Sequence, residues 1–157
     1  MNKKLLLVII SVLIFTLSIG YFVGSANLFR GKTIGAAMSK VDEIIWYNSQ
    51  LDYTNQIYDH CSQKENASEK LFCINQYVVE NYNYRLVEDV YSIDEMFDNG
   101  ADCKSYSIYY ATLAKMMGYD YLFVQLPNHI FTMVYFDEGY CVLDEKVYAC
   151  FDYGEEE

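Results

Sequence analysis

The sequence predicts an α+β fold in which N-terminal helices pack on a small antiparallel β-sheet, preceded by one transmembrane helix. Three observations support this prediction. An uncharged run of twenty residues, Leu5 to Gly24, lies near the start of the chain. Apolar residues then recur at helical spacing as far as residue 118. Four short strand-like runs separated by tight turns follow, and helices followed by adjacent strands are typical of an α+β domain.

The N-terminal run is long enough to cross a bilayer, because about 20 apolar residues span the hydrocarbon core as a helix. A secretory signal has a shorter apolar region of about 7–15 residues and a small-residue cleavage site. Gly24-Ser25-Ala26 resembles such a site, so residues 1–24 are a transmembrane anchor or a signal segment. The length favours an uncleaved anchor and hence a single-pass membrane protein. Two basic residues flank the run on each side, so these charges do not set its orientation. The cysteines discussed below favour an external domain and a cytoplasmic N-terminus.

Residues 25–65 are expected to form a juxtamembrane linker, 25–32, followed by a helix. The apolar side chains of this helix recur at three, four and six residues, which is a helical stripe. They are Ile34, Met38, Val41, Ile45 and Leu51.

A second helix is expected to begin at Asn66, because Asn66 with Glu69 three residues later resembles a capping box. Its apolar face is formed by Leu71, Ile74, Tyr77, Val78 and Tyr82. The segment 81–99 is polar and irregular, with one helical turn expected at 92–97.

A third helix is expected to begin near Cys103 and to end at Gly118. Asp102 is a good N-cap because its carboxylate accepts from the backbone N–H groups of the first turn, and glycine fits the left-handed residue that ends a helix. Four antiparallel strands are then expected at 121–125, 130–136, 140–144 and 147–151. Asp137-Glu138-Gly139 and Glu145-Lys146 supply turns. The acidic tail, residues 154–157, is expected to be solvated.

Five cysteines in a small domain are many for a reducing compartment. If Glu145-Lys146 centres a tight turn, Cys141 faces Cys150 on the neighbouring strand, close enough to bridge. Cys61 and Cys73 flank a polar connection and form a second candidate disulfide, which leaves the fifth cysteine over. Five buried thiols are the alternative. The pairing indicates an oxidising exterior and therefore an extracytoplasmic domain.

Charge and cysteine spacing exclude several classes of protein. Residues 25–157 carry 9 basic and 22 acidic side chains, a net charge of −13. Such a surface repels phosphate backbones, so nucleic acid is not an expected partner. The cysteine gaps of 12, 30, 38 and 9 residues contain neither the paired spacing of zinc ligands nor a Cys-x-x-Cys redox pair. No metal and no cofactor are therefore expected.

Cys103, His129 and Asp144 form a candidate catalytic triad. A thiol ionises more readily at a helix N-terminus, where unpaired N–H groups favour the thiolate. Asp102 beside it opposes ionisation unless its charge is engaged in capping. His129 follows the only proline of the chain and is the candidate base. Asp144 ends the next strand and is the candidate group that orients the imidazole.

The two strand residues of this triad share a face only if an even number of residues forms the hairpin loop, such as Asp137-Glu138. That register puts His129 opposite Lys146, about 7 Å along the strand from Asp144. Taken singly, each residue also has a purely structural explanation. Cys103 could be a small buried core residue, His129 a histidine with its hydrogen bonds satisfied within the fold, and Asp144 the residue that opens the turn. Their joint order on a helix, a strand and the next strand favours a functional triad.

The stretches "FDNGADCKSYSIYYATLAKMMGYDYLFVQ", "NHIFTMVYF" and "GYCVLD" resemble the transglutaminase-like superfamily. Its pattern is a cysteine that opens a helix shortly after a glycine, a glycine at the end of that helix, a strand, a histidine that begins a strand and an aspartate that ends the next. The preceding "CINQYVVENYNYR" resembles the helix ending in x-Tyr-x-Tyr that the family places upstream of its cysteine. The resemblance covers residues 66–153.

The resemblance implies a papain-like α+β arrangement over residues 66–153, with Cys103 as nucleophile, His129 as base and Asp144 as orienting carboxylate. Family chemistry is acyl transfer through a thioester and needs no metal, so a protein or peptide substrate is expected. The leading hypothesis is a membrane-anchored cysteine hydrolase or acyltransferase acting on peptide or glutamine amides. The alternative is a catalytically inactive binding module of the same fold at the membrane surface. The complete triad favours the enzyme.

Overall fold

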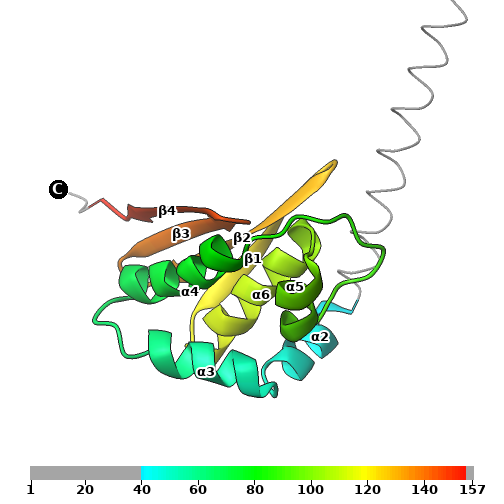
Figure 1. Ribbon diagram of the computed structural model, residues 1–157. Coiled ribbons are helices and arrows are strands. Elements are labelled where there is room, and N and C mark those ends of the chain that lie inside the picture. Colours follow the sequence, from blue (N-terminus) through cyan, green and yellow to red (C-terminus); the bar gives the residue numbers. More distant parts are fainter. Residues whose placement is uncertain (1–39, 155–157) are drawn as a thin grey trace, which may run out of the picture.

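A computed structural model describes residues 40–154 of the 157-residue chain (Figure 1). Five helices precede four strands in this part of the chain, which confirms the predicted α+β architecture. The helices are α2 (Val41–Asn48), α3 (Asp52–Cys61), α4 (Ala67–Asn81), α5 (Ile93–Asn99) and α6 (Cys103–Met116). The strands are β1 (Asp120–Leu126), β2 (His129–Phe136), β3 (Gly139–Asp144) and β4 (Val147–Asp152).

The predicted transmembrane helix requires correction. The run at 5–24 lies outside the described residues. Among residues 40–154, no helix combines the length and the apolar character needed to cross a bilayer. The longest, α4, has 15 residues and includes charged side chains, whereas a span needs about 20 apolar residues. No described helix therefore supports the expected membrane-spanning helix or the single-pass localisation that followed from it.

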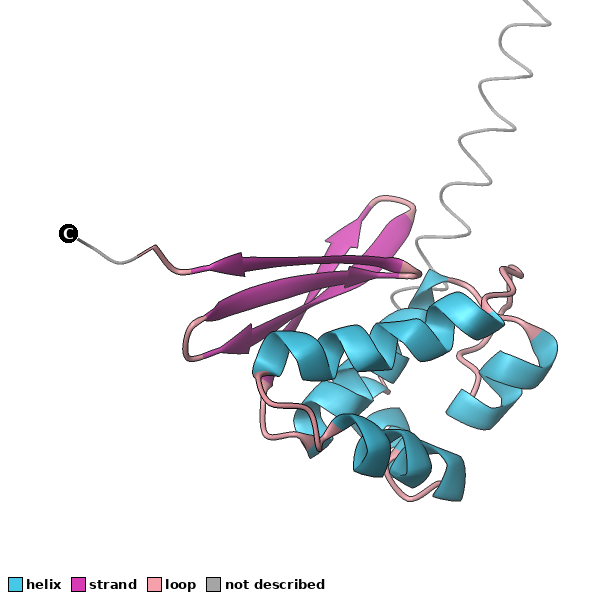
Figure 2. Ribbon diagram, turned by 60° about the vertical axis from the view of Figure 1, so that its left-hand side comes forward, coloured by secondary structure: helices cyan, strands magenta, loops and turns pink. Residues whose placement is uncertain are grey.

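The sheet is an antiparallel meander with the strand order β1-β2-β3-β4 (Figure 2). Phe136 pairs with Gly139, so the loop between β2 and β3 is the two-residue turn Asp137-Glu138. Asp144 pairs with Val147 across a second two-residue turn. Both loops are even, as the shared face of the proposed triad residues requires.

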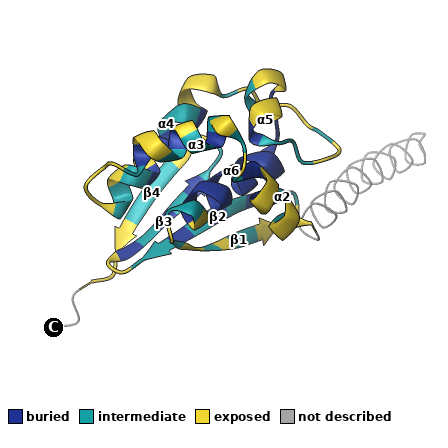
Figure 3. Ribbon diagram, turned by 90° about the horizontal axis from the view of Figure 1, so that it is seen from below, coloured by how far each residue is buried: buried dark blue, intermediate teal, exposed yellow. Residues whose placement is uncertain are grey.

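Helix α6 packs against the sheet, mainly on β2, α4 contacts β3 and β4, and the helices gather on one side of the sheet (Figures 1 and 3). Every residue from Cys103 to Ala114 is buried. Two hydrogen bonds tie α6 to β2: Ser107 Oγ donates to the Ile130 carbonyl at 3.0 Å, and Thr132 Oγ1 donates to the Ser107 carbonyl at 2.9 Å. These bonds fix the start of α6 against the start of β2.

The helix expected after the linker is divided in two. Residues before 40 lie outside the described part, and the remainder forms α2 and α3 with a break at 49–51. Asn48 ends α2 with its side chain buried, and its Oδ1 accepts from the Ile93 backbone N–H at 3.3 Å. An apolar stripe does not reveal such a break, because the break depends on a contact with a distant segment.

The N-termini of α4 and α5 lie where the sequence predicts a helix start and a helical turn. Asn66 Oδ1 accepts from the Glu69 backbone N–H at 2.8 Å and opens α4. The turn expected at 92–97 is the beginning of α5, where Ser92 and Glu95 form a reciprocal capping box.

Candidate active site

Cys103 is the first residue of α6 and is 1% exposed. Asp102 precedes it in extended conformation, and its Oδ1 accepts from the Lys104 backbone N–H at 3.1 Å. Gly100 has φ +76°, and a Cβ there would lie 2.7 Å from the Asn83 carbonyl oxygen. The glycine and the cap therefore let the chain turn into α6 with the thiol in its first helical position.

Asp102 also forms an ion pair with the ammonium of Lys104, and both side chains are 2% exposed. Lys104 Nζ donates a second hydrogen bond to the Val87 carbonyl at 2.9 Å, and the Val87 N–H donates to Asp102 Oδ2 at 3.4 Å. The negative charge beside Cys103 is therefore balanced by a cation. Both the cap and Lys104 therefore engage the Asp102 carboxylate.

His129 and Asp144 are joined by a hydrogen bond of 2.7 Å between Nε2 and Oδ1. Their side chains are 29% and 30% exposed, so solvent reaches the pair. Thr132 pairs with Leu143 across β2 and β3, and this register places His129 two residues along the strand from the position opposite Asp144. Because Nε2 contacts the carboxylate, Nδ1 is the ring nitrogen left for the thiol.

Cys103 packs beside Ile130, the residue that follows His129 in β2. Cys103 and Ile130 form a small buried cluster against which Phe123 packs. Ile130 follows His129 directly, and alternation along β2 puts the two side chains on opposite sides of the strand. His129 is the first residue of β2, so it lies at the end of the strand that is hydrogen-bonded to the first turns of α6. The structure joins His129 to Asp144 and packs Cys103 against the residue that follows His129.

Three residues to which the sequence assigned no part in the site lie at the turn after Asp144: Glu145, Tyr82 and Tyr110. Glu145 has φ 49°, and its carboxylate accepts from the Tyr82 hydroxyl. The Tyr110 hydroxyl donates to the Glu145 backbone carbonyl. With 17 tyrosines in the chain, no sequence signal distinguishes these two.

Among residues 40–154, the one His, Cys, Asp and Glu grouping that could hold a metal ion is His129, Asp144 and Glu145, whose ligand atoms lie within 4.8 Å of one another. An ion there would compete with the hydrogen bond between His129 and Asp144. The arrangement as it stands is that of an imidazole oriented by a carboxylate.

The remaining four cysteines form disulfides. Cys61 joins Cys73 with a Cα–Cα distance of 5.5 Å, and Cys141 joins Cys150 at 4.0 Å. Cys141 and Cys150 are directly opposed across β3 and β4. These are the two pairs that the spacing suggested, and five separate thiols do not describe this structure.

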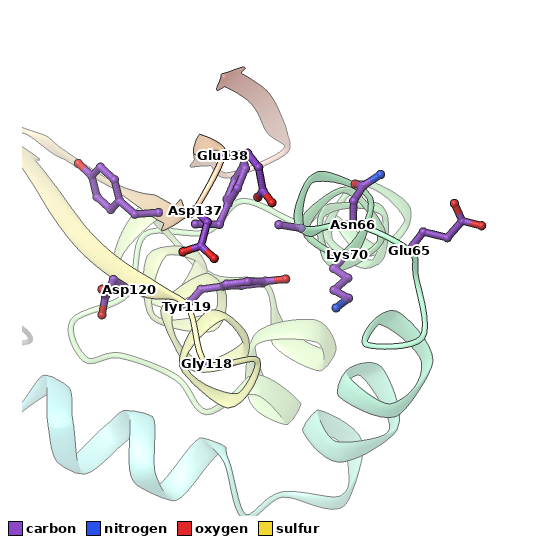
Figure 4. A pocket seen from close by; sticks show the side chains of 11 residues that line it. Glu65, Asn66, Lys70, Gly118, Tyr119, Asp120, Asp137 and Glu138 are labelled. Atoms are coloured by element: carbon purple, nitrogen blue, oxygen red, sulfur yellow. The ribbon is translucent and has the colours of Figure 1, made fainter. Parts of the chain in front are cut away.

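A pocket of about 540 Å³ lies between the start of α4, the end of α6 and the turn between β2 and β3 (Figure 4). Asp137 and Glu138 lie on one side of it and Lys70 on the other, with Tyr119 below. None of the three triad residues lines it. It lies at the opposite end of β2 from His129, so this pocket is separate from the candidate active site.

The chain matches no family model, no curated protein and no solved structure. The assignment of a function therefore depends on the residues and their geometry.

Proposed function

We propose that this protein is a transglutaminase-like cysteine enzyme that hydrolyses or transfers the acyl group of peptide or glutamine amides. Cys103 is the nucleophile, His129 the base and Asp144 the orienting carboxylate. The observation that carries the proposal is the 2.7 Å bond between His129 Nε2 and Asp144 Oδ1, at the end of the sheet against which Cys103 packs. An oriented base beside a thiol at a helix N-terminus is the requirement for an activated cysteine.

In this mechanism, His129 Nδ1 takes the thiol proton and Cys103 Sγ attacks the amide carbonyl carbon. The backbone N–H of Cys103, at the start of α6, stabilises the negative charge on the tetrahedral oxygen. The imidazolium, held by Asp144, returns the proton to the leaving amine as the carbon–nitrogen bond breaks. Water then adds to the thioester with His129 as base, and the carbon–sulfur bond breaks to release the acid and the thiol. An amine in place of water gives transfer.

The exposure of the pair favours hydrolysis. His129 and Asp144 are each about three-tenths exposed, so water has access to the base that would activate it. A transferase must exclude water from the thioester.

A catalytically inactive binding module of the same fold is the second candidate, and one observation favours it. Cys103 is 1% exposed, whereas a substrate carbonyl must reach its sulfur. The two candidates differ in the reactivity of the thiol in the folded protein.

Alkylation of the full-length, non-reduced protein with iodoacetamide tests the proposal. Cys103 should be the single labelled site, and His129→Ala should slow labelling at least about tenfold, because a general base typically contributes a factor of about 10²–10⁴. His60→Ala is the matched control, since His60 is the only other histidine, and it should react at the wild-type rate.

Glutamine-containing peptides provide the test of turnover. The protein should release ammonia or a new amino terminus from them, and Cys103→Ala should abolish this release. If Cys103 does not react with iodoacetamide in the folded protein, or if His129→Ala leaves its labelling rate unchanged, the protein is a binding module.

A further inference from the structure

We propose that Glu145, Tyr82 and Tyr110 are positioning residues that hold the turn after Asp144, and thereby keep the Asp144 carboxylate on His129. This inference rests on the proposed function, since it assigns a role to three residues that support the base of that site. None of the three is placed in the reaction itself.

The backbone of Glu145 is held in an unfavourable conformation. Asp144 pairs with Val147, so Glu145 and Lys146 alone form the turn between β3 and β4. Glu145 has φ 49° and is the one non-glycine residue with positive φ among residues 40–154. Such positions in two-residue turns favour Gly, Asn or Asp, because a larger side chain crowds the backbone. An unfavourable conformation persists only where neighbouring contacts impose it.

Two tyrosines hold Glu145 in this conformation. The Tyr110 hydroxyl donates to the Glu145 carbonyl and accepts from Asn75 Nδ2 at 2.8 Å, so its direction is set. Tyr110 is fully buried in α6, and Asn75 belongs to α4. The Tyr82 hydroxyl, just beyond the end of α4, donates to the Glu145 carboxylate. Backbone and side chain of Glu145 are therefore held separately.

The packing of Tyr82 adds rigidity to this contact. Its ring stacks on Tyr106 with centroids 5.3 Å apart, and Lys146 Nζ lies 4.8 Å from its centroid on a face of the ring. Burial, followed by the hydrogen bond to Glu145, raises the pKa of Tyr82, and burial raises the pKa of Tyr110. Both hydroxyls therefore remain protonated donors over the pH range in which a cysteine enzyme works.

The turn acts on Asp144 directly, because Asp144 is covalently bonded to Glu145. The carboxylate of Asp144 is about three-tenths exposed, and the hydrogen bond that orients it goes to His129. Its position therefore depends on that bond and on the backbone that follows it. A shift of the turn by about 1 Å misaligns the pair, and displacements of that size can cost about a hundredfold in rate.

Adjacent tyrosines of α6 provide a matched test. Tyr110→Phe removes the hydroxyl that holds Glu145, whereas Tyr109→Phe removes an equally buried hydroxyl that donates to the Ile74 carbonyl at 2.9 Å. Tyr109→Phe loses this one hydrogen bond, whereas Tyr110→Phe loses the bond to Glu145 and also the one from Asn75. We expect Tyr110→Phe to slow alkylation of Cys103 about tenfold or more and to alter its pH profile, and Tyr109→Phe to leave both unchanged.

Glu145→Gly separates positioning from stability. Glycine adopts the positive φ without steric cost, but the substitution deletes the carboxylate that accepts from the Tyr82 hydroxyl. We expect a protein whose thermal midpoint is equal to or above wild type and whose Cys103 reacts about tenfold more slowly. A residue with only a structural role would change both properties in the same direction.

The ring ¹⁵N chemical shifts of His129 in the full-length protein report its bond to Asp144 without any reaction. Altered shifts in Tyr110→Phe and Glu145→Gly, but not in Tyr109→Phe, are the expected result. Unchanged shifts and rates in the first two variants would overturn the inference, even if His129→Ala shows that the triad works. If the shifts change but His129→Ala reacts at the wild-type rate, the positioning holds and the proposed function fails.

Discussion

Lys104 and Asp102 form a buried ion pair across Cys103, the residue that separates them in the chain. The pair joins the start of α6 to the loop at Val87, because the Val87 carbonyl accepts from Lys104 Nζ and the Val87 N–H donates to Asp102. One charged pair therefore caps the helix, anchors a loop and neutralises the surroundings of the thiol.

Lys104→Met should destabilise the fold by about 3–5 kcal/mol, because it leaves the Asp102 carboxylate buried without a cation. Urea denaturation measures this change. The double variant Asp102→Asn/Lys104→Met should recover part of the loss, since no buried charge remains and asparagine is also a good N-cap. Equal losses in the single and double variants would contradict the role given to the pair.

Gly100→Ala should cost more stability than Gly118→Ala, although both glycines have φ near +76° to +79°. At Gly118 a Cβ meets nothing within 4 Å, so alanine costs only the left-handed backbone, about 1 kcal/mol. At Gly100 the Cβ would lie 2.7 Å from the Asn83 carbonyl, which accepts from the Ala101 N–H. We expect about 2 kcal/mol or more, measured by thermal unfolding; similar values for both variants would show that the Asn83 contact is unimportant.

Unfolding the protein without reductant should expose one thiol to alkylation, and adding reductant should expose five, because Cys103 lies outside the two disulfides. Replacing Cys141 and Cys150 together by serine should cost about 2–3 kcal/mol, as expected for a short closed loop. Mass spectrometry counts the labels. Two or more labels without reductant would mean that a disulfide is absent.

The domain should lose stability as the pH rises above about 10. Burial raises the pKa of Tyr106, Tyr109 and Tyr110 above their ordinary value of 10.0, so the unfolded chain releases these protons first. Their contribution is complete below that value and falls by about 1.4 kcal/mol per pH unit for each tyrosine above it. Urea unfolding at increasing pH checks the slope, and Tyr109→Phe should reduce it. A stability that stays constant through this range would contradict the burial of these hydroxyls.

The sequence predicted the secondary structure around the candidate site well, because local chemistry determines it. Asp102 and Gly100 mark the start of α6, and the two-residue turn Asp137-Glu138 sets the register that puts His129 and Asp144 on one face. The opposition of Cys141 and Cys150 followed from the Glu145-Lys146 turn in the same way.

The contacts that complete the site could not be predicted, because they join distant segments. Lys104 reads as an ordinary surface lysine at a helix start, and its burial depends on the loop at Val87. Tyr82 and Tyr110 meet Glu145 across 63 and 35 residues of chain. The expected membrane-spanning helix was a conclusion from composition alone, and no described helix supports it.

His129 and Asp144 lie fifteen residues apart on one hairpin, whereas Cys103 comes from the helical layer. Contacts of short sequence separation form early in folding, and contacts between layers form late. His129 and Asp144, the proposed base and its carboxylate, can therefore meet within a nascent hairpin, before Cys103 arrives. Under the proposed function, a chain that has not yet docked α6 has no proton acceptor near the sulfur, so the thiol becomes reactive only in the last stage of folding.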